Sequence, residues 1–232
     1  MMKTYLVGEN FPEQYQNTLK KYGRVVVLPR SEAIPAPTGT HPDALVGVVG
    51  GELIVPKNET AVSRTLTDAG ISHTVSVRES GEKYPDDCAV NFFTVGGFFV
   101  AKTDTVAPEA LIASSRAGLE IIDVRQGYAH CATAVISGGI ITADAGIYRA
   151  LSERGVPSLK IEAGGIDLPP YDYGFIGGAS GMIDGETVFF FGSLDAHPSG
   201  AAIRDFCSSL GVKVVEGDGK LSDFGGFITL DT

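Results

Sequence analysis

Hydrophobic and polar positions recur along the chain in a regular order. Three segments each contain a β-branched or aromatic run, a Gly-Gly pair and a second such run: Ala44–Pro56, Cys88–Ala101 and Cys131–Ala143. These residues favour pleated strands, and Gly-Gly supplies the positive φ angles of a two-residue hairpin turn. A fourth copy, Gly174–Gly192, turns at Asp184-Gly185. The pattern therefore predicts four β-hairpins.

A helical segment and a short strand follow each hairpin. The helical segments end on a glycine, which suits the left-handed position after a helix; they span residues 58–70, 108–118, 145–155 and 199–211. The strands span residues 73–77, 119–124, 157–161 and 212–215. Because the turns begin at residues 50, 96, 138 and 184, the unit repeats at intervals of 46, 42 and 46 residues. We interpret it as a ββαβ unit.

A fifth unit is divided between the two ends of the chain. Residues 224–230 supply one strand, and residues 4–7, 11–23 and 24–28 supply its partner, a helix and a last strand. Pairing of the terminal strands would close five units into a ring, which removes sheet edges that invite aggregation. An open α+β sandwich with chance glycine spacing is the alternative.

Length and charge narrow the expected class. A chain of 232 residues with 44% hydrophobic residues can form a sizeable core, and we predict a single domain over residues 1–232. The 18 basic and 28 acidic residues give a net charge of −10. Since this charge opposes the basic surface that phosphate backbones require, we expect no nucleic-acid partner and a cationic or neutral ligand.

Three scattered cysteines argue against a disulfide framework. Cys88, Cys131 and Cys207 form no CxxC pair, so we expect a cytoplasmic location. No signal-peptide core or run of about 18 apolar residues is present, so we expect no membrane association. No histidine pair has ligand spacing and no glycine pair belongs to a phosphate-binding motif, so we predict no metal and no cofactor.

This architecture resembles the pentein, or α/β-propeller, fold of the guanidino-group-modifying superfamily. That superfamily includes arginine deiminases, dimethylarginine hydrolases, agmatine deiminases and amidinotransferases, and the chain looks most like an uncharacterised bacterial branch of it. The resemblance implies a five-bladed α/β propeller and a small cationic substrate. The same fold also carries a ribosome anti-association factor without catalysis, so the fold leaves the function open.

In a ring of repeats, the loops that lead into the first strand of each hairpin converge on one axis. These loops carry carboxylates, a thiol and imidazoles where a structural repeat needs only loop residues, and they are His41-Pro-Asp43, Asp86-Asp87-Cys88, Tyr128-Ala-His130-Cys131, Tyr171-Asp172-Tyr173 and Ser222-Asp223. The sequence therefore predicts a polar central pocket.

Cys131 is the candidate nucleophile. A thiolate needs a depressed pKa or a nearby base, and His41 could provide one. Residues 127–133 resemble the Gly-rich segment that holds the nucleophilic cysteine in the superfamily. The alternative is a buried small hydrophobic residue at the start of a strand. His130 would point to the opposite face if the strand has already begun.

The segment from Gly39 to Asp43 is similar to the Gly-x-His-x-Asp pattern of the family's catalytic histidine. That resemblance implies that His41 is the acid and base, because imidazole protonates a departing amine near neutral pH. Asp43 would bind the guanidinium by paired hydrogen bonds. A turn is the alternative, since Pro-Asp is also good turn chemistry.

Other residues are candidates for holding the substrate. Asp87 and Asn91 could bind its cationic group, although Asp86 and Asp87 could also form a solvated turn. Arg125 could bind a carboxylate, or form a surface salt bridge. The remaining candidates are Glu162, Asp167 and Asp223.

Glu162-Ala-Gly-Gly-Ile-Asp167 loosely resembles the family's acidic-Gly-Gly-Asp segment, but Ile166 is inserted and the family's downstream arginine is missing. The expected function is a hydrolase or transferase that acts on a guanidine or amidine C–N bond. The alternative is a non-catalytic protein of the same fold that binds a small molecule or a partner.

Overall fold

The computed structural model describes residues 3–231, and its strands form five sheets. The strands are β1 (Lys3–Gly8), β2 (Gly23–Leu28), β3 (Gly47–Val49), β4 (Glu52–Val55), β5 (Thr74–Val75), β6 (Phe93–Val95), β7 (Phe98–Ala101), β8 (Glu120–Asp123), β9 (Thr133–Ile136), β10 (Gly139–Thr142), β11 (Ser158–Lys160), β12 (Ser180–Met182), β13 (Thr187–Phe190), β14 (Lys213–Glu216) and β15 (Ile228–Asp231).

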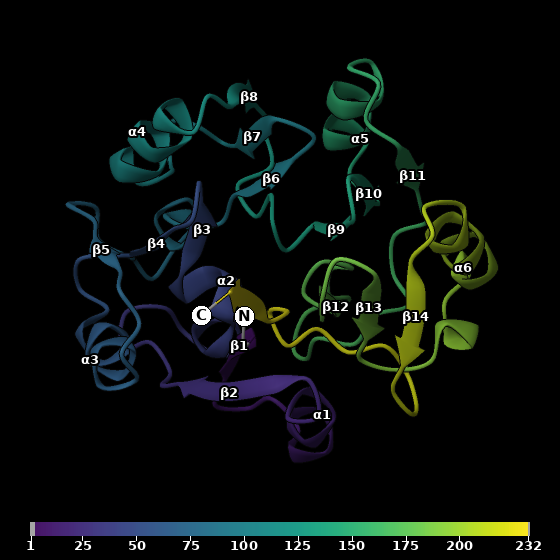
Figure 1. The fold of residues 1–232 in the computed structure, drawn as a ribbon, viewed down its shortest axis with the longest axis horizontal. Coiled ribbons are helices and arrows are strands. Elements are labelled where there is room, and N and C mark those ends of the chain that lie inside the picture. The colour runs from purple at the N-terminus through teal and green to yellow at the C-terminus, as the bar shows by residue number, and fades with distance from the viewer. Residues whose placement is uncertain (1–2, 232) are drawn as a thin grey trace.

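Each sheet has three strands, and its central strand pairs antiparallel on one side and parallel on the other. The strand orders are β15-β1-β2, β3-β4-β5, β6-β7-β8, β9-β10-β11 and β12-β13-β14. Figure 1 shows these sheets following one another in chain order around the middle of the molecule. The structure thus contains the expected ββαβ order in every unit.

The helices lie in the predicted segments. They are α1 (Glu13–Leu19), α2 (Pro42–Leu45), α3 (Thr60–Asp68), α4 (Pro108–Arg116), α5 (Ala145–Ser152) and α6 (Gly200–Ser209), with 3-10 turns η1 (Thr38–Thr40), η2 (Asp86–Cys88) and η3 (Leu194–Ala196). Only α2 was not expected. It replaces the predicted start of the first hairpin at Ala44 because Pro42 occupies its first turn, where a missing N–H costs nothing.

Several predicted strands are shorter than expected, and two of them show why. Cys88 lies in η2, and β6 begins only at Phe93. The strand predicted over residues 224–230 begins only at Ile228, because Gly225 and Gly226 have φ angles of +73° and +68° that no strand contains.

The two terminal strands are hydrogen-bonded to each other. β15 runs antiparallel to β1, and Lys3 is opposite Asp231, with the Nζ and Oδ1 atoms 2.5 Å apart. This geometry is that of a hairpin whose turn is replaced by the two chain ends. It brings the loop before β15 into the same region as the loop after β2.

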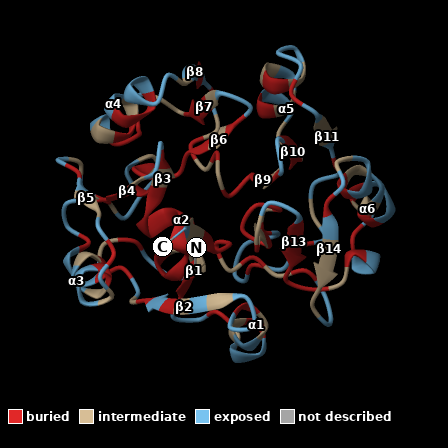
Figure 2. Ribbon diagram, in the orientation of Figure 1, coloured by how far each residue is buried: buried red, intermediate tan, exposed pale blue. Residues whose placement is uncertain are grey.

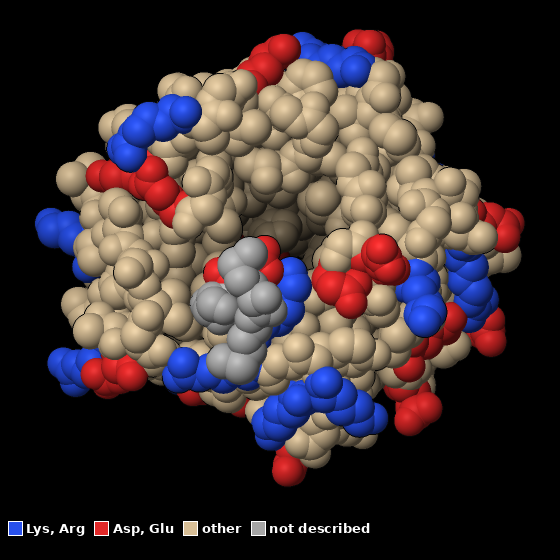
Figure 3. Space-filling model, viewed as in Figure 1, with Lys and Arg blue, Asp and Glu red and all other residues tan. Residues whose placement is uncertain are grey.

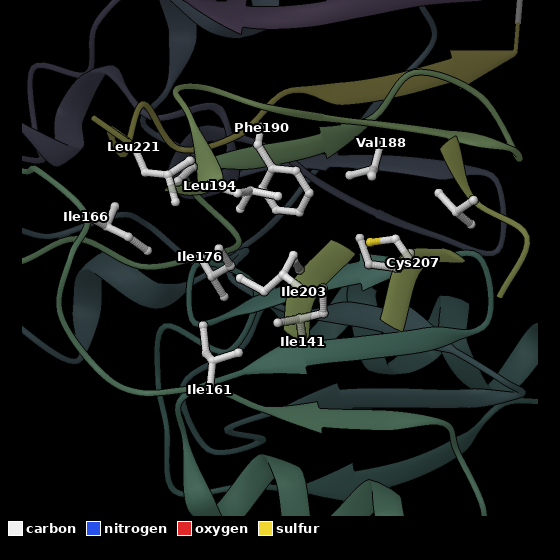
Figure 4. Close-up of a cluster of buried hydrophobic side chains, with 14 residues drawn as sticks. Ile141, Ile161, Ile166, Ile176, Val188, Phe190, Leu194, Ile203, Cys207 and Leu221 are labelled. Atoms are coloured by element: carbon white, nitrogen blue, oxygen red, sulfur yellow. The ribbon is translucent and has the colours of Figure 1, made fainter. Parts of the chain in front are cut away.

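Five apolar clusters join neighbouring sheets. One packs β10 against β13 and α6, and Figure 4 shows Ile141, Val188, Phe190, Ile203 and Cys207 within it. Three others join the remaining consecutive pairs of sheets, and the fifth packs aromatic residues of the β13 sheet against β1 and α1. Figure 2 shows that burial is greatest toward the middle, where α2 is entirely buried.

A cavity of about 270 Å³ contains residues from all five sheets. Each sheet provides lining residues from one edge strand. Examples from β3, β6, β9, β12 and β15 are, in that order, Val48, Thr94, Val135, Met182 and Thr229. The face in Figure 3 has a central hollow, and the residues along its upper side in this view are uncharged. None of the helices in the described part of the chain combines the length and apolarity needed to cross a bilayer.

A substitution at Phe191 tests how much the aromatic cluster between the β13 sheet and the β1 sheet stabilises the fold. Phe191 is fully buried, and its ring centroid is 5.0 Å from that of Phe11 and 5.9 Å from that of Phe227. We expect Phe191→Ala to lower the free energy of unfolding by about 3–5 kcal/mol, because it leaves a cavity. Urea denaturation measures this change. Val77→Ala, at a largely exposed position, should stay within about 0.5 kcal/mol of wild type; equal effects would contradict the assignment.

Candidate active site

Four of the five converging loops contribute a chemically reactive or charged side chain to one cavity: His41, Cys131, Asp172 and Asp223. The cavity has a volume of about 290 Å³, and it is lined by Thr38, His41, Tyr128, Cys131, Leu168, Tyr171, Asp172, Tyr173, Phe175 and Asp223. His41 immediately precedes α2, Cys131 lies two residues before β9, and Asp223 lies before β15. The fold therefore brings together a thiol, an imidazole and a carboxylate from distant parts of the chain.

Cys131 is held by two side chains. Its Sγ–H donates to Asp43 Oδ2 over 2.8 Å, and Asn91 Nδ2 donates to Sγ over 3.1 Å. Asn91 also accepts hydrogen bonds at Oδ1 from the backbone N–H groups of His130 and Cys131. Asn91 thus fixes both the backbone and the sulfur of the candidate nucleophile, and it lies outside the cavity lining.

Cys131 is a protonated thiol in this environment. Only 6% of the residue is exposed. Burial raises its pKa well above the ordinary value, and the neighbouring carboxylates of Asp43 and Asp223 raise it further. Burial and Asp223 also raise the pKa of Asp43. Burial therefore disfavours the charged form of both members of this hydrogen-bonded pair.

His41 is buried without a full set of partners. It is 1% exposed, and its Nδ1 lies 3.6 Å from Asp223 Oδ1, a charge-pair distance too long for a hydrogen bond. Neither ring nitrogen has a hydrogen-bond partner among residues 3–231. Burial lowers the pKa of His41, and Asp223 partly opposes that effect. Burial thus favours a neutral imidazole, and His41 lines the cavity with both ring nitrogens buried and unpartnered within the described chain.

The segment Asp223-Phe224-Gly225-Gly226 positions both Asp223 and His41. Asp223 accepts hydrogen bonds from the N–H groups of Phe175, over 2.8 Å, and Gly225, over 2.9 Å. Gly225 has φ +73°, and a Cβ there would lie 2.2 Å from the Cβ of His41. Only glycine permits this close approach.

The same acidic-x-Gly-Gly pattern occurs at Glu162, where the sequence resemblance was noted. The structure places Glu162 at the surface, beside a different cavity of about 230 Å³. Both copies lie in a segment that leads to the first strand of a hairpin, and they differ in their distance from that strand: Asp223 lies five residues before Ile228, where β15 begins, and Glu162 lies 18 residues before Ser180, where β12 begins.

Asp87 lies behind the cavity wall. Its Oδ2 accepts a hydrogen bond from Tyr128 Oη over 2.5 Å, and its Oδ1 lies 3.4 Å from the Cys88 thiol. Burial and the Asp87 carboxylate both raise the pKa of Tyr128. Asp87 therefore orients a tyrosine that lines the cavity. Asp86 is exposed and lies 3.8 Å from an Arg78 nitrogen.

Three predicted residues lie away from Cys131. Arg125 is exposed in a groove that it shares with Asp144 and Arg149. Asp167 is exposed, and its Oδ1 lies 3.7 Å from Lys220 Nζ. With Glu162, these residues line no part of the cavity that contains Cys131.

The aromatic walls of the cavity were not predicted. Tyr128, Tyr171, Tyr173 and Phe175 line it, and the ring centroids of Tyr128 and Tyr173 both lie 6.4 Å from that of Phe175. The sequence feature that could have predicted these walls is the presence of three tyrosines in two of the converging loops.

His130 faces a separate space. It lines the cavity that contains residues from all five sheets, and its Nδ1 has no hydrogen-bond partner within the described chain. Burial lowers its pKa to about 4. Within residues 3–231, no group of three or more His, Cys, Asp or Glu side chains is placed to hold a metal ion.

Comparisons with known proteins give a family and a fold. Residues 6–228 match the family described as "Family of unknown function (DUF6873)". The chain belongs to this family. A search of curated proteins finds no match.

Solved structures confirm the expected resemblance in fold. Two are dimethylarginine dimethylaminohydrolases: one from Pseudomonas aeruginosa, a cysteine-to-serine mutant complexed with citrulline (TM-score 0.53), and a histidine-to-glycine variant with an S-methyl-L-thiocitrulline adduct (TM-score 0.54). Each is 13% identical and covers 99% of both chains. The third is an amidinotransferase of saxitoxin biosynthesis from Microseira wollei (TM-score 0.56, 11% identity, 99% of this chain and 94% of that one). At these identities the likeness is one of fold.

The protonation state of Cys131 predicts a pH profile. A thiol whose pKa is raised stays protonated at neutral pH and forms thiolate only when the pH approaches the raised value. We expect alkylation of Cys131 by neutral iodoacetamide in the ligand-free protein to be at least tenfold slower at pH 7.5 than that of glutathione, and to increase continuously above pH 9. Mass spectrometry of the Cys131 peptide measures it; a plateau below pH 8 would show a depressed pKa instead.

Proposed function

We propose that the protein is a hydrolase or transferase that acts on a guanidine or amidine C–N bond of a small cationic substrate. The observation that carries this proposal is that Cys131, His41 and Asp223 line one buried cavity while Asp43 accepts the thiol hydrogen bond. The site is built from a nucleophile, a proton carrier and carboxylates without a compensating cation. A cationic planar group would supply the missing charge.

We also infer a single-domain, five-bladed α/β propeller for residues 1–232. The support is that apolar clusters join each sheet to the next and the last sheet to the first, and that β1 pairs with β15. All three cysteines are free, which fits the reducing conditions of the cytoplasm.

Binding of the cation would activate the thiol. The Oδ1 atom of Asp43 has no hydrogen-bond partner among the described residues, so this carboxylate can accept from a guanidinium N–H group. A positive charge beside Sγ offsets the effect of the Asp43 and Asp223 carboxylates on the thiol and lowers its pKa. The nucleophile would therefore form only when a suitable substrate occupies the cavity.

His41 would carry the proton through the reaction. The thiol proton moves to the His41 imidazole as Sγ forms a bond with the guanidinium carbon. The C–N bond then breaks, and the departing amine takes the proton from His41. In a hydrolase, water adds to the carbon, its proton moves to His41, and cleavage of the C–S bond returns the thiol. In a transferase, an amine replaces the water.

A non-catalytic binding protein is the second candidate. The observation that favours it is the protonated thiol, since a binding site needs no thiolate. The two candidates differ in how Cys131 responds to a bound cation.

Alkylation by 2-chloroacetamidine distinguishes them. We expect this cationic reagent to modify Cys131 at least tenfold faster than neutral iodoacetamide does, after each rate is divided by its rate with glutathione, because its amidinium lowers the thiol pKa on binding. Mass spectrometry locates the adduct. Cys131→Ser should abolish the fast reaction, and Cys207→Ser, in the apolar cluster of α6, should leave it unchanged. Equal relative rates would favour the binding protein.

Turnover tests the role of His41. For any guanidine that wild type consumes, we expect His41→Ala to reduce kcat/KM by about 10²–10⁴-fold, as for loss of a general acid–base. Cys131→Ala should abolish turnover, with product formation followed by mass spectrometry. Retention of wild-type kcat/KM by Cys131→Ala would exclude the covalent mechanism.

A further inference from the structure

The charge of the cavity lining limits which guanidines fit. Besides Cys131, its ionisable residues are His41, three tyrosines and the carboxylates Asp172 and Asp223. No lysine or arginine occurs among the described residues that line it. Arg125, the residue expected to bind a substrate carboxylate, lies in a different groove.

Several hydrogen-bond donors beside the cavity already have acceptors. In the loop that forms one wall, the N–H group of Tyr171 donates to Leu168 O, that of Gly174 to Ile166 O and that of Phe175 to Asp223. Tyr128 donates its hydroxyl to Asp87. A carboxylate in this cavity would lose its hydration without gaining a strong partner, and it would lie near Asp172.

The cavity walls suit a substrate whose tail, the part beyond the guanidinium, carries no carboxylate. Tyr171 and Tyr173 remain 55% and 45% exposed at the cavity, next to the partly buried Phe175. Aromatic faces pack against alkyl groups and attract cations. Exposed Asp172 takes part in no ion pair within residues 3–231, so it is available to a positive group at the mouth.

We propose that the ligand is a guanidine without a carboxylate, whose tail is an uncharged or amine-bearing alkyl chain. This inference rests on the proposed function, which places the guanidinium beside Cys131. The head group is then held by the buried carboxylates, the alkyl chain lies along the tyrosines, and an amine at its end approaches Asp172. Amino-acid guanidines are excluded by their α-carboxylate.

A series of four-carbon guanidines tests the tail. Butylguanidine, 4-aminobutylguanidine and 4-guanidinobutyrate differ only at the end of the chain, and L-arginine adds the α-amino acid. Each competes with 2-chloroacetamidine for Cys131 in the full-length protein, and mass spectrometry gives the concentration that halves the labelling rate. We expect butylguanidine and 4-aminobutylguanidine to protect at concentrations at least tenfold lower than 4-guanidinobutyrate and L-arginine.

Asp172 provides the matched variant. We expect Asp172→Asn to weaken protection by 4-aminobutylguanidine two- to fivefold, as for an exposed charge pair, and to leave butylguanidine unchanged. Asp205→Asn, an equal charge change on the exposed surface of α6, should alter neither. Asp172→Arg should strengthen protection by 4-guanidinobutyrate.

The outcomes separate this inference from the proposed function. If labelling prefers the cationic reagent but 4-guanidinobutyrate or L-arginine protects as well as butylguanidine, the substrate class is wrong and the reaction class stands. If labelling shows no preference for the cation and no guanidine protects, the proposed function fails and this inference fails with it. If Asp172→Asn and Asp205→Asn behave alike, Asp172 does not contact the tail.

Discussion

Hydrogen bonding between the first and last strands is the constraint on which the rest of the structure depends. It fixes the loop that carries Asp223 beside the loop that carries His41, although the two lie near opposite ends of the chain. The aromatic cluster of β1, α1 and the β13 sheet also holds these two loops together, because Phe227 packs against Tyr5 and Phe11 within it. Without this pairing the cavity would lose a carboxylate and the glycine that supports the imidazole.

The second organising principle is electrostatic. Cys131, Asp43 and His41 are almost fully buried, and burial favours the neutral form of each. The carboxylates of Asp43 and Asp223 add to this effect at Cys131, because a nearby negative charge raises the pKa of a thiol. In the proposed function, a bound cation would offset the carboxylates that keep the thiol protonated.

The repeat and most of the secondary structure could be predicted from the sequence, because they depend on local signals. Gly50-Gly51 and Gly96-Gly97 mark turns by the φ angles they adopt, and the glycines after the helices mark their ends. The short helix α2 was missed because its residues also suit a strand, and tertiary burial decides between the two. The predicted length of the last strand was too great because Gly225 adopts a positive φ angle and packs against His41, so the strand begins only at Ile228.

The candidate site was predictable only in part. Cys131, His41, Asp43 and Asp223 meet because equivalent loops of the repeat converge. Arg125 and Glu162 have the right chemistry, but their place depends on how loops between units cross the surface, which periodicity does not encode. Whether Asn91 contacts a ligand or supports Cys131 is likewise decided by packing. The sequence therefore predicted which residue types form the candidate site, but not where each of their side chains would point.

The pairing of Lys3 with Asp231 also affects how the chain could be connected. Asp231 and Lys3 are opposite each other at the place where the other four sheets have a tight turn. A short linker there, with new ends opened at another hairpin such as Gly96-Gly97, would preserve every strand pairing. The fold thus permits circular permutation in principle, because the pairing of β1 with β15 needs no covalent turn between them.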